Sequence, residues 1–281
     1  MKIEKAAKTG FCFGVRRAVS ILEKVARERG SVETLGEVVH NAQVLQKLAA
    51  QGVTVAGNIA DIKGNVVVTS SHGVSPKIED QIKARRIDII STTCPFVRRA
   101  QMTARRLAES GFMVVVFGDA AHPEVKGILG WAQGKGIATR DVKPIASLKP
   151  LPRRIGILSQ TTQIPAQFIT FAQQIIEVAL KKDSEIRIID TICHDIRERQ
   201  KTAQELAEAV DLMLVIGGRN SANTRHLAEL CAHAAETHHI ENAGEIQPSW
   251  VKGKTSIGVT GGASTPEDTV AEVLERLAGM T

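Results

Sequence analysis

A threefold internal repeat is the feature that most restricts how this chain of 281 residues can fold. Cys12, Cys94 and Cys193 each open a segment that continues into a helical pattern of apolar residues. Apolar residues spaced three, four and seven apart line one face of an amphipathic helix. The matching positions, three and thirteen residues after the cysteine, are Val15, Val97 and Ile196, then Val25, Leu107 and Leu206. Equal offsets favour a true repeat over the alternative, one continuous doubly wound sheet with chance similarity.

Each repeat also carries apolar runs typical of buried strands, and these runs end in polar loops. Examples are MVVVFGDAAH and LMLVIGGRNS and, later in each repeat, NVVVTSSHGVSP, RIGILSQTTQIP and TSIGVTGGASTP. Strands that alternate with helices predict right-handed βαβ units and parallel sheets. We therefore expect an α/β fold of three pseudo-repeated lobes around a central cavity, each a small parallel sheet with helices. The expected lobes comprise residues 12–93, 94–192 and 193–281, and the N-terminal segment 1–11 is expected to pair with the last.

The loops after the expected strands hold most of the chemically active side chains. Parallel sheets bind ligands beyond the carboxyl ends of their strands, so these loops predict one binding site. His, Ser and Asn side chains together with helix N-terminal amides form a typical anion site. Glu124 fits two interpretations, proton delivery or a first-turn residue favoured by the helix dipole. Besides the three cysteines, the candidate residues are His40, Asn41, His72, His122, Glu124, Thr161, Thr162, Ser221, Asn223 and Ser264.

The three repeated cysteines predict a metal centre. Structural zinc usually takes four ligands, often in close pairs, and these cysteines are widely spaced. Iron–sulfur clusters are commonly held by thiolates, and three thiolates on a cubane cluster leave its fourth iron open. Each cysteine also precedes a helix, whose dipole favours the thiolate. Cys231 lies inside the helical pattern LAELCAHA without a repeat counterpart, and we expect it to be a core residue.

Composition narrows the partners. The net charge of +6 favours anionic partners, whereas 3% aromatic residues and no Tyr leave few rings for stacking on bases, so nucleic acid is not expected. The N-terminus lacks a signal peptide pattern and no run is long enough for a membrane span, which predicts a cytoplasmic protein. Arginines follow each cysteine and form either a solvated face or a basic rim that attracts an acidic protein: Arg16, Arg17, Arg98, Arg99, Arg197 and Arg199.

Nine short motifs, in order and over nearly the whole chain, resemble the 4-hydroxy-3-methylbut-2-enyl diphosphate reductase family of LytB type. They are GFCFGV, VHN, SHGVSP, TCPFV, HPEV, SQTTQ, DTIC, NSANT and GGASTP. The resemblance implies reductive dehydroxylation of the allylic alcohol diphosphate, with two electrons and two protons, to isopentenyl and dimethylallyl diphosphate. It also implies one [4Fe-4S] cluster per chain on Cys12, Cys94 and Cys193, whose fourth iron takes the substrate hydroxyl.

The resemblance assigns roles to the loop residues as well. Glu124 matches the carboxylate that delivers a proton, and Thr161 matches a threonine near the substrate hydroxyl. Ala222 departs from the family, where a second serine is common, and its backbone amide is expected to bind phosphate instead. Other departures are Ala121, Lys126 and the HDI stretch after Cys193. The diphosphate is expected to contact His40, His72, His122, Ser221, Asn223 and Ser264.

Three other functions compete with the reductase. A non-redox iron–sulfur dehydratase would not need a reductant. A cluster sensor that binds an anion without turnover would carry an output element, for which the repeats leave little room in the chain. A zinc hydrolase would contain a different metal.

Overall fold

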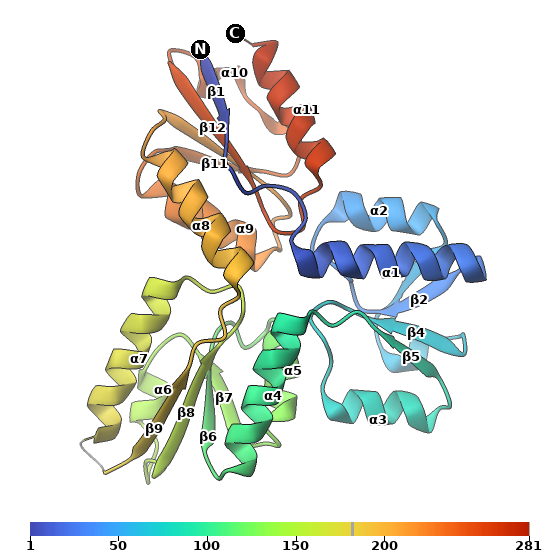
Figure 1. Ribbon diagram of the computed structural model, residues 1–281, viewed down its shortest axis with the longest axis vertical. Coiled ribbons are helices and arrows are strands. Elements are labelled where there is room, and N and C mark those ends of the chain that lie inside the picture. Colours follow the sequence, from blue (N-terminus) through green and yellow to red (C-terminus); the bar gives the residue numbers. More distant parts are fainter. Residues whose placement is uncertain (181–182, 281) are drawn as a thin grey trace. The chain divides into compact units, whose positions relative to one another are not determined.

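The computed structural model describes residues 1–180 and 183–280, in which the strands form three four-stranded sheets with parallel pairing throughout (Figure 1). The first sheet has the order β3-β2-β4-β5, the second β7-β6-β8-β9 and the third β1-β12-β10-β11. The strands of the first two sheets are β2 (Val32–Leu35), β3 (Val53–Ala56), β4 (Val66–Thr69), β5 (Asp88–Ser91), β6 (Met113–Phe117), β7 (Gly136–Thr139), β8 (Arg154–Ser159) and β9 (Glu185–Ile189). Those of the third are β1 (Lys2–Lys5), β10 (Leu212–Ile216), β11 (Glu236–Ile240) and β12 (Ser256–Gly261).

Helices connect the strands, as the βαβ pattern predicts. The helices that follow the three cysteines are α1 (Phe13–Arg29), α4 (Pro95–Glu109) and α8 (His194–Ala207). The others are α2 (Ala42–Ala50), α3 (Pro76–Ala84), α5 (Pro123–Trp131), α6 (Lys143–Ala146), α7 (Pro165–Leu180), α9 (Ala222–Ala232), α10 (Pro248–Val251) and α11 (Glu267–Ala278). Two short 3-10 helices are Ile59–Asp61 and Ala243–Glu245. None of these described helices is long and apolar enough to cross a membrane.

The three sheets share one topology, which confirms the predicted α/β repeat. In the first two sheets, the first strand along the chain lies between the second and the third, and a fourth pairs with the third; β10, β11 and β12 repeat the first three places in the third sheet. β5 and β9 take the fourth place in the first two sheets. β1 takes the fourth place in the third sheet, where it pairs in parallel with β12, for example Ile3 beside Ile257. The N-terminal segment therefore completes the sheet that ends the chain.

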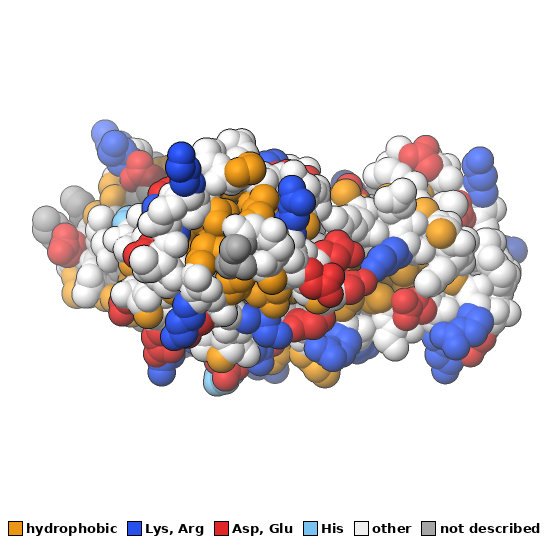
Figure 2. All heavy atoms as spheres, turned by 90° about the horizontal axis from the view of Figure 1, so that it is seen from above, with side chains coloured by type: hydrophobic (Ala, Val, Ile, Leu, Met, Phe, Trp, Pro, Cys, Tyr) orange, Lys and Arg blue, Asp and Glu red, His pale blue; other side chains and the backbone are white. Residues whose placement is uncertain are grey.

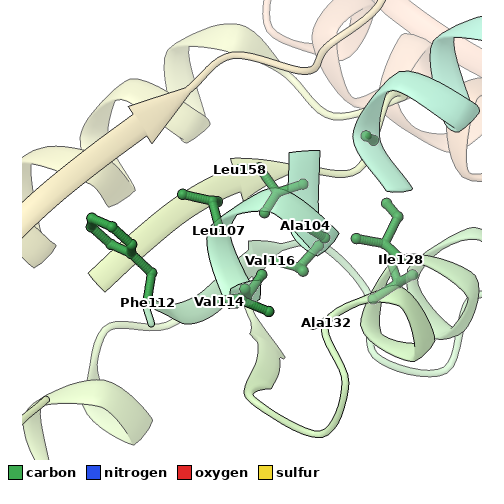
Figure 3. Close-up of a cluster of buried hydrophobic side chains, with 11 residues drawn as sticks. Ala104, Leu107, Phe112, Val114, Val116, Ile128, Ala132 and Leu158 are labelled. Carbon is green, nitrogen blue, oxygen red and sulfur yellow. The ribbon is translucent and has the colours of Figure 1, made fainter. Parts of the chain in front are cut away.

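The cores lie between the sheets and their helices. In the second sheet, Val114, Val116 and Leu158 are fully buried against helix α4 (Figure 3). Gly156 in β8 permits this close packing, since a Cβ there would lie 2.7 Å from a methyl of Leu107. Gly258 in β12 is its counterpart, where a Cβ would lie 3.0 Å from Leu206.

Chain contacts divide the protein into two compact units. The first unit comprises Met1–Arg16, Val39–Leu48 and His194–Thr281, and the second comprises Arg17–Val38 and Ala49–Cys193. The lobe boundaries at residues 12, 94 and 193 stay predictions. The candidate residues divide between the two units, and each unit is described by itself below.

Candidate active site

The three cysteines occupy equivalent places relative to their sheets. Each cysteine donates its backbone N–H to a carbonyl in the loop that follows the third strand of a sheet, β12, β4 or β8. Each cysteine thus lies beside one of the loops that sequence reasoning singled out. The three bonds are Cys12 to Ala263 at 2.9 Å, Cys94 to Ser71 at 3.0 Å and Cys193 to Thr161 at 3.1 Å.

The thiols of Cys12, Cys94 and Cys193 suit a metal centre. All three are half-buried, none forms a disulfide within the described residues, and each directly precedes or caps a helix. Burial raises the pKa of the Cys12 thiol, and the backbone N–H of Val15, 3.4 Å from Sγ, opposes this. Burial thus favours the neutral thiol, and a metal bound here would hold the sulfur as a thiolate and release its proton.

Cys231 has a different environment. It is fully buried in a core cluster of the first unit, and its Sγ lies 3.7 Å from the carbonyl oxygen of Ala203. Burial raises the pKa of this thiol to about 12, so the side chain stays neutral at physiological pH. The prediction of a core residue is confirmed.

Glu124 and Thr161 form a buried pair in the second unit. Glu124 lies in the first turn of helix α5 and is 2% exposed. Its Oε1 accepts the backbone N–H of Thr161 at 2.7 Å, and its Oε2 accepts the Thr161 hydroxyl at 2.9 Å. Burial raises the pKa of Glu124 to about 7, while the two bonds from Thr161 oppose the rise. A carboxyl with this pKa is well suited to donate a proton at neutral pH.

This shifted pKa predicts how stability depends on pH. Because the pKa of Glu124 is raised from 4.5 to about 7, the folded chain binds this proton more tightly than the unfolded chain. The stabilising contribution is present below pH 4.5 and is lost as the pH rises through 7. From pH 5 to 8 we expect the wild type to lose about 2–3 kcal/mol of unfolding free energy relative to Glu124→Gln. Denaturant unfolding of both cluster-free chains measures this, and parallel pH curves would contradict it.

Two histidines lie beside this pair. His122 caps helix α5, and its Nδ1 accepts the N–H of Glu124 at 3.1 Å, so the neutral ring carries its proton on Nε2. The ring of His72 meets it edge to face, with centroids 5.3 Å apart. The second unit thus brings together His72, His122, Glu124 and Thr161 near the loops that hold Cys94 and Cys193.

Gln160 is a residue that sequence reasoning missed. Its buried side chain donates to the Thr162 hydroxyl at 3.2 Å and accepts the backbone N–H of Asp119 at 3.2 Å. The carbonyl of Asp119 in turn accepts the N–H of His122 at 3.0 Å. Gln160 therefore links the loop of Thr161 and Thr162 to the loop of His122. The sequence signal that could have indicated Gln160 is its place in the motif SQTTQ, beside Thr161 and Thr162.

In the first unit, the N-terminus of helix α9 is the candidate anion site. Ser221 caps this helix and accepts the N–H of Thr224 at 3.3 Å, and Ala222 begins it. Asn223 is 3% exposed, and its amide nitrogen and oxygen both lack a partner among the described residues. A buried amide without partners is costly, and a bound phosphate oxygen would satisfy its N–H groups.

His40 and Ser264 lie beside this helix terminus in the same unit. The Ser264 hydroxyl donates to the carbonyl of His40 at 3.4 Å. Gly218, in the loop before Ser221, packs so closely that a Cβ would lie 2.4 Å from the same carbonyl. Asn41 caps helix α2, because its Oδ1 accepts the N–H of Val44 at 3.1 Å. This oxygen therefore already has a hydrogen bond that stabilises the helix terminus.

Arg199 is the second residue whose place the sequence did not reveal. We expected the arginines after the cysteines on a solvated face or a basic rim, but Arg199 is fully buried. Its guanidinium donates to the carbonyls of Gly261 at 2.7 Å and Gly10 at 2.9 Å, and lies 3.6 Å from Asp195. Burial removes Arg199 from any surface rim.

Comparison with known proteins identifies the family of this chain. The family model described as LytB protein matches residues 3–278. The 4-hydroxy-3-methylbut-2-enyl diphosphate reductase of Dehalococcoides mccartyi is 57% identical over 281 residues, which cover 99% of each chain. The reductase of that name from Geobacter metallireducens is 42% identical, covering 99% of this chain and 97% of the relative.

Two solved structures are similar to the fold. One is (E)-4-hydroxy-3-methyl-but-2-enyl diphosphate reductase, the terminal enzyme of the non-mevalonate pathway, with 35% identity and a TM-score of 0.72 over 99% of this chain and 100% of that one. The other is the E-1-hydroxy-2-methyl-but-2-enyl-4-diphosphate reductase of Plasmodium falciparum, with a TM-score of 0.92 over 98% and 87%. At 23% identity this second likeness shows the fold alone. The resemblance seen in the sequence motifs is thus confirmed, and the chain belongs to the LytB family.

Proposed function

We propose that this chain is a reductase that removes the hydroxyl of (E)-4-hydroxy-3-methylbut-2-enyl diphosphate to give isopentenyl and dimethylallyl diphosphate. Its relatives at 42–57% identity bear the name of this reductase. The observation in this chain that carries the proposal is Glu124. A buried carboxyl with a pKa of about 7 bonds to Thr161, whose carbonyl is tethered to Cys193.

The proposal includes one [4Fe-4S] cluster held by Cys12, Cys94 and Cys193. Support comes from three half-buried thiols with equivalent backbone bonds, each at the start of a helix. When bound, the cluster supplies electrons and a Lewis-acidic iron for the substrate hydroxyl. We place the reaction in the cytoplasm, because cluster thiolates require a compartment that keeps cysteine reduced.

The diphosphate is assigned to the polar loops. The N-terminus of α9 offers backbone amides, the Ser221 hydroxyl and the unsatisfied amide of Asn223. Ala222 contributes its backbone N–H in place of a hydroxyl. The remaining substrate contacts in the proposal are His40, Asn41, His72, His122, Thr162 and Ser264. Anchoring the diphosphate positions the small allylic group, which is catalysis by orientation.

Glu124 and Thr161 are assigned to proton delivery. In the structure the Thr161 hydroxyl donates to Oε2 of Glu124. In the proposal the hydroxyl turns to donate to the departing oxygen of the substrate, and the protonated Oε2 of Glu124 then donates its proton to the Thr161 oxygen. The N–H of Thr161 on Oε1 holds the carboxyl in one orientation throughout. His122 is oriented by its bond from the N–H of Glu124, and in the proposal its Nε2–H donates to the diphosphate.

The experiment that tests the proposal is anaerobic purification followed by iron and sulfide analysis and an assay with the allylic diphosphate. The expected result is about four irons per chain and turnover that requires a chemical reductant. Turnover without a reductant would favour the dehydratase, and binding without turnover would favour the sensor. Zinc in place of iron would favour the hydrolase.

The electron donor in the proposal is an acidic ferredoxin or flavodoxin. The arginines available to it are exposed, including Arg16 and Arg98, while Arg199 is not. Figure 2 shows Lys and Arg side chains interspersed with Asp and Glu over one face of the molecule.

Neutralising these exposed arginines tests the donor assignment. We expect Arg16→Gln and Arg98→Gln to lower activity with the protein donor and to flatten its salt dependence, because the Debye length falls from about 10 Å at 0.1 M salt to about 3 Å at 1 M. Activity with a small chemical reductant should not change. Equal losses with both reductants would place these arginines in the fold or the active site, and no loss would leave them as solvated surface.

A further inference from the structure

Each helix that follows a cysteine sends one arginine to the segment that leads into the next cysteine. Arg17 follows Cys12, Arg99 follows Cys94 and Arg199 follows Cys193 by five or six residues. Their guanidinium groups donate to backbone carbonyls just before another cysteine. The three bonds are Arg17 Nη1 to Thr93 O at 3.5 Å, Arg99 Nη2 to Asp190 O at 3.0 Å and Arg199 Nη2 to Gly10 O at 2.9 Å.

The direction of these bonds is cyclic. The first cysteine helix contacts the segment of Cys94, the second contacts the segment of Cys193, and the third contacts the segment of Cys12. We infer that Arg17, Arg99 and Arg199 are positioning residues that fix each cysteine from the helix of the preceding one. This inference rests on the proposed function, in which the three thiolates hold one cluster.

The helix dipole does not account for the repeated position of these arginines. Positive charge near the N-terminus of a helix is mildly disfavoured by the dipole. A guanidinium offers five donors in a fixed fork and so orients a carbonyl more rigidly than an ammonium. Bonds to the segments before the cysteines give the repeated position of the arginines a physical reason.

The segments before the three cysteines differ in how they are tied to the neighbouring strand. Two residues before Cys94 and Cys193 stand the buried threonines Thr92 and Thr191, whose hydroxyls donate to the last carbonyl of β4 and to that of β8. Two residues before Cys12 stands Gly10, which has no hydroxyl and a φ of 71°.

Arg199 replaces the absent hydroxyl. The carbonyls of Thr69 and Ser159 accept from the two threonines, and their counterpart at the end of β12 is Gly261. Arg199 Nη1 donates to that carbonyl at 2.7 Å while Nη2 donates to Gly10. One buried side chain therefore joins the strand end to the segment of Cys12, as a threonine does in the other two repeats.

Geometry ranks the three contacts. The Arg199 bonds are short and buried, the Arg99 bond is of normal length and exposed, and the Arg17 bond is long. We therefore expect the influence on the next cysteine to fall from Arg199 to Arg99 to Arg17. A typical hydrogen bond contributes about 1 kcal/mol net. Loss of the Arg99 bond should therefore raise the equilibrium constant for local opening of the segment before Cys193 about fivefold.

The experiment follows which thiolate is released first. The anaerobic holoenzyme is treated with an iron chelator and iodoacetamide, and alkylation of Cys12, Cys94 and Cys193 is timed by mass spectrometry. In Arg99→Gln, alkylation of Cys193 should be about fivefold faster relative to Cys94, and Arg99→Lys should restore part of the difference. Arg106→Gln, an exposed arginine on the same helix, should keep the wild-type order.

The other two positions extend the test. Arg199→Lys, which keeps a buried donor and charge, should selectively speed alkylation of Cys12. Arg17→Gln should act on Cys94 and more weakly. Three results for Arg99→Gln would overturn the inference. Alkylation could speed up selectively at Cys94, the cysteine of the same helix; it could speed up equally at all three cysteines; or the order of alkylation could stay as in the wild type. Iron content is measured separately, so a wild type without iron defeats the proposed cluster, while the order of alkylation still decides the positioning role.

Discussion

Replacing Glu124 by Gln is expected to lower turnover about 10²- to 10⁴-fold, the usual contribution of a general acid. Gln keeps the size of the side chain, and its carbonyl oxygen can still accept the N–H of Thr161, which Oε1 accepts at 2.7 Å in the wild type. It cannot give up a proton as a carboxylic acid. The cluster spectrum and substrate affinity should be unchanged, so steady-state kinetics beside the visible spectrum of the holoenzyme measure the effect.

The matched control for this prediction is Glu79→Gln. Glu79 lies in the first turn of helix α3, as Glu124 lies in the first turn of α5. A purely dipolar role predicts similar small effects at both positions. Turnover that falls less than about threefold in Glu124→Gln, against the 10²-fold minimum expected of a general acid, would make Glu124 a structural first-turn residue.

Replacing Cys94 by Ser is expected to impair cluster binding and to abolish activity, because a serine oxygen is a poor substitute for a thiolate on iron. The same result is expected for Cys12→Ser and Cys193→Ser, since the three backbone bonds place these residues equivalently. Iron and sulfide analysis of the anaerobically prepared variants, together with the visible spectrum, measures the loss.

Cys231→Ser is the control for the cysteine series. Its side chain lies in the core, and a hydroxyl there has the carbonyl of Ala203 within reach. We expect this variant to keep both the cluster and the activity. An active Cys94→Ser enzyme with a full cluster would remove the cysteine assignment and with it the proposed mechanism.

The sequence alone determined the repeat and the list of candidate residues. Cys12, Cys94 and Cys193 stand out because helical periodicity and strand-end loops are local patterns that recur at equal offsets. The parallel pairing within the sheets follows from βαβ connectivity once strands and helices alternate, whereas the strand order came from the structure. The family resemblance could be recognised for the same reason, since its motifs are short and continuous in the chain.

The tertiary structure decided how individual side chains are surrounded. The sequence left Glu124 with two interpretations, proton delivery or a first-turn residue, because its pKa depends on burial and on Thr161, which lies 37 positions away. In the sequence Arg199 looked like the other arginines that follow the cysteines, yet it donates to carbonyls of two distant backbone segments, at Lys8 and Gly10 and at Gly261. Solvation and the direction of a hydrogen bond depend on atoms far apart in the chain, so no local pattern encodes them.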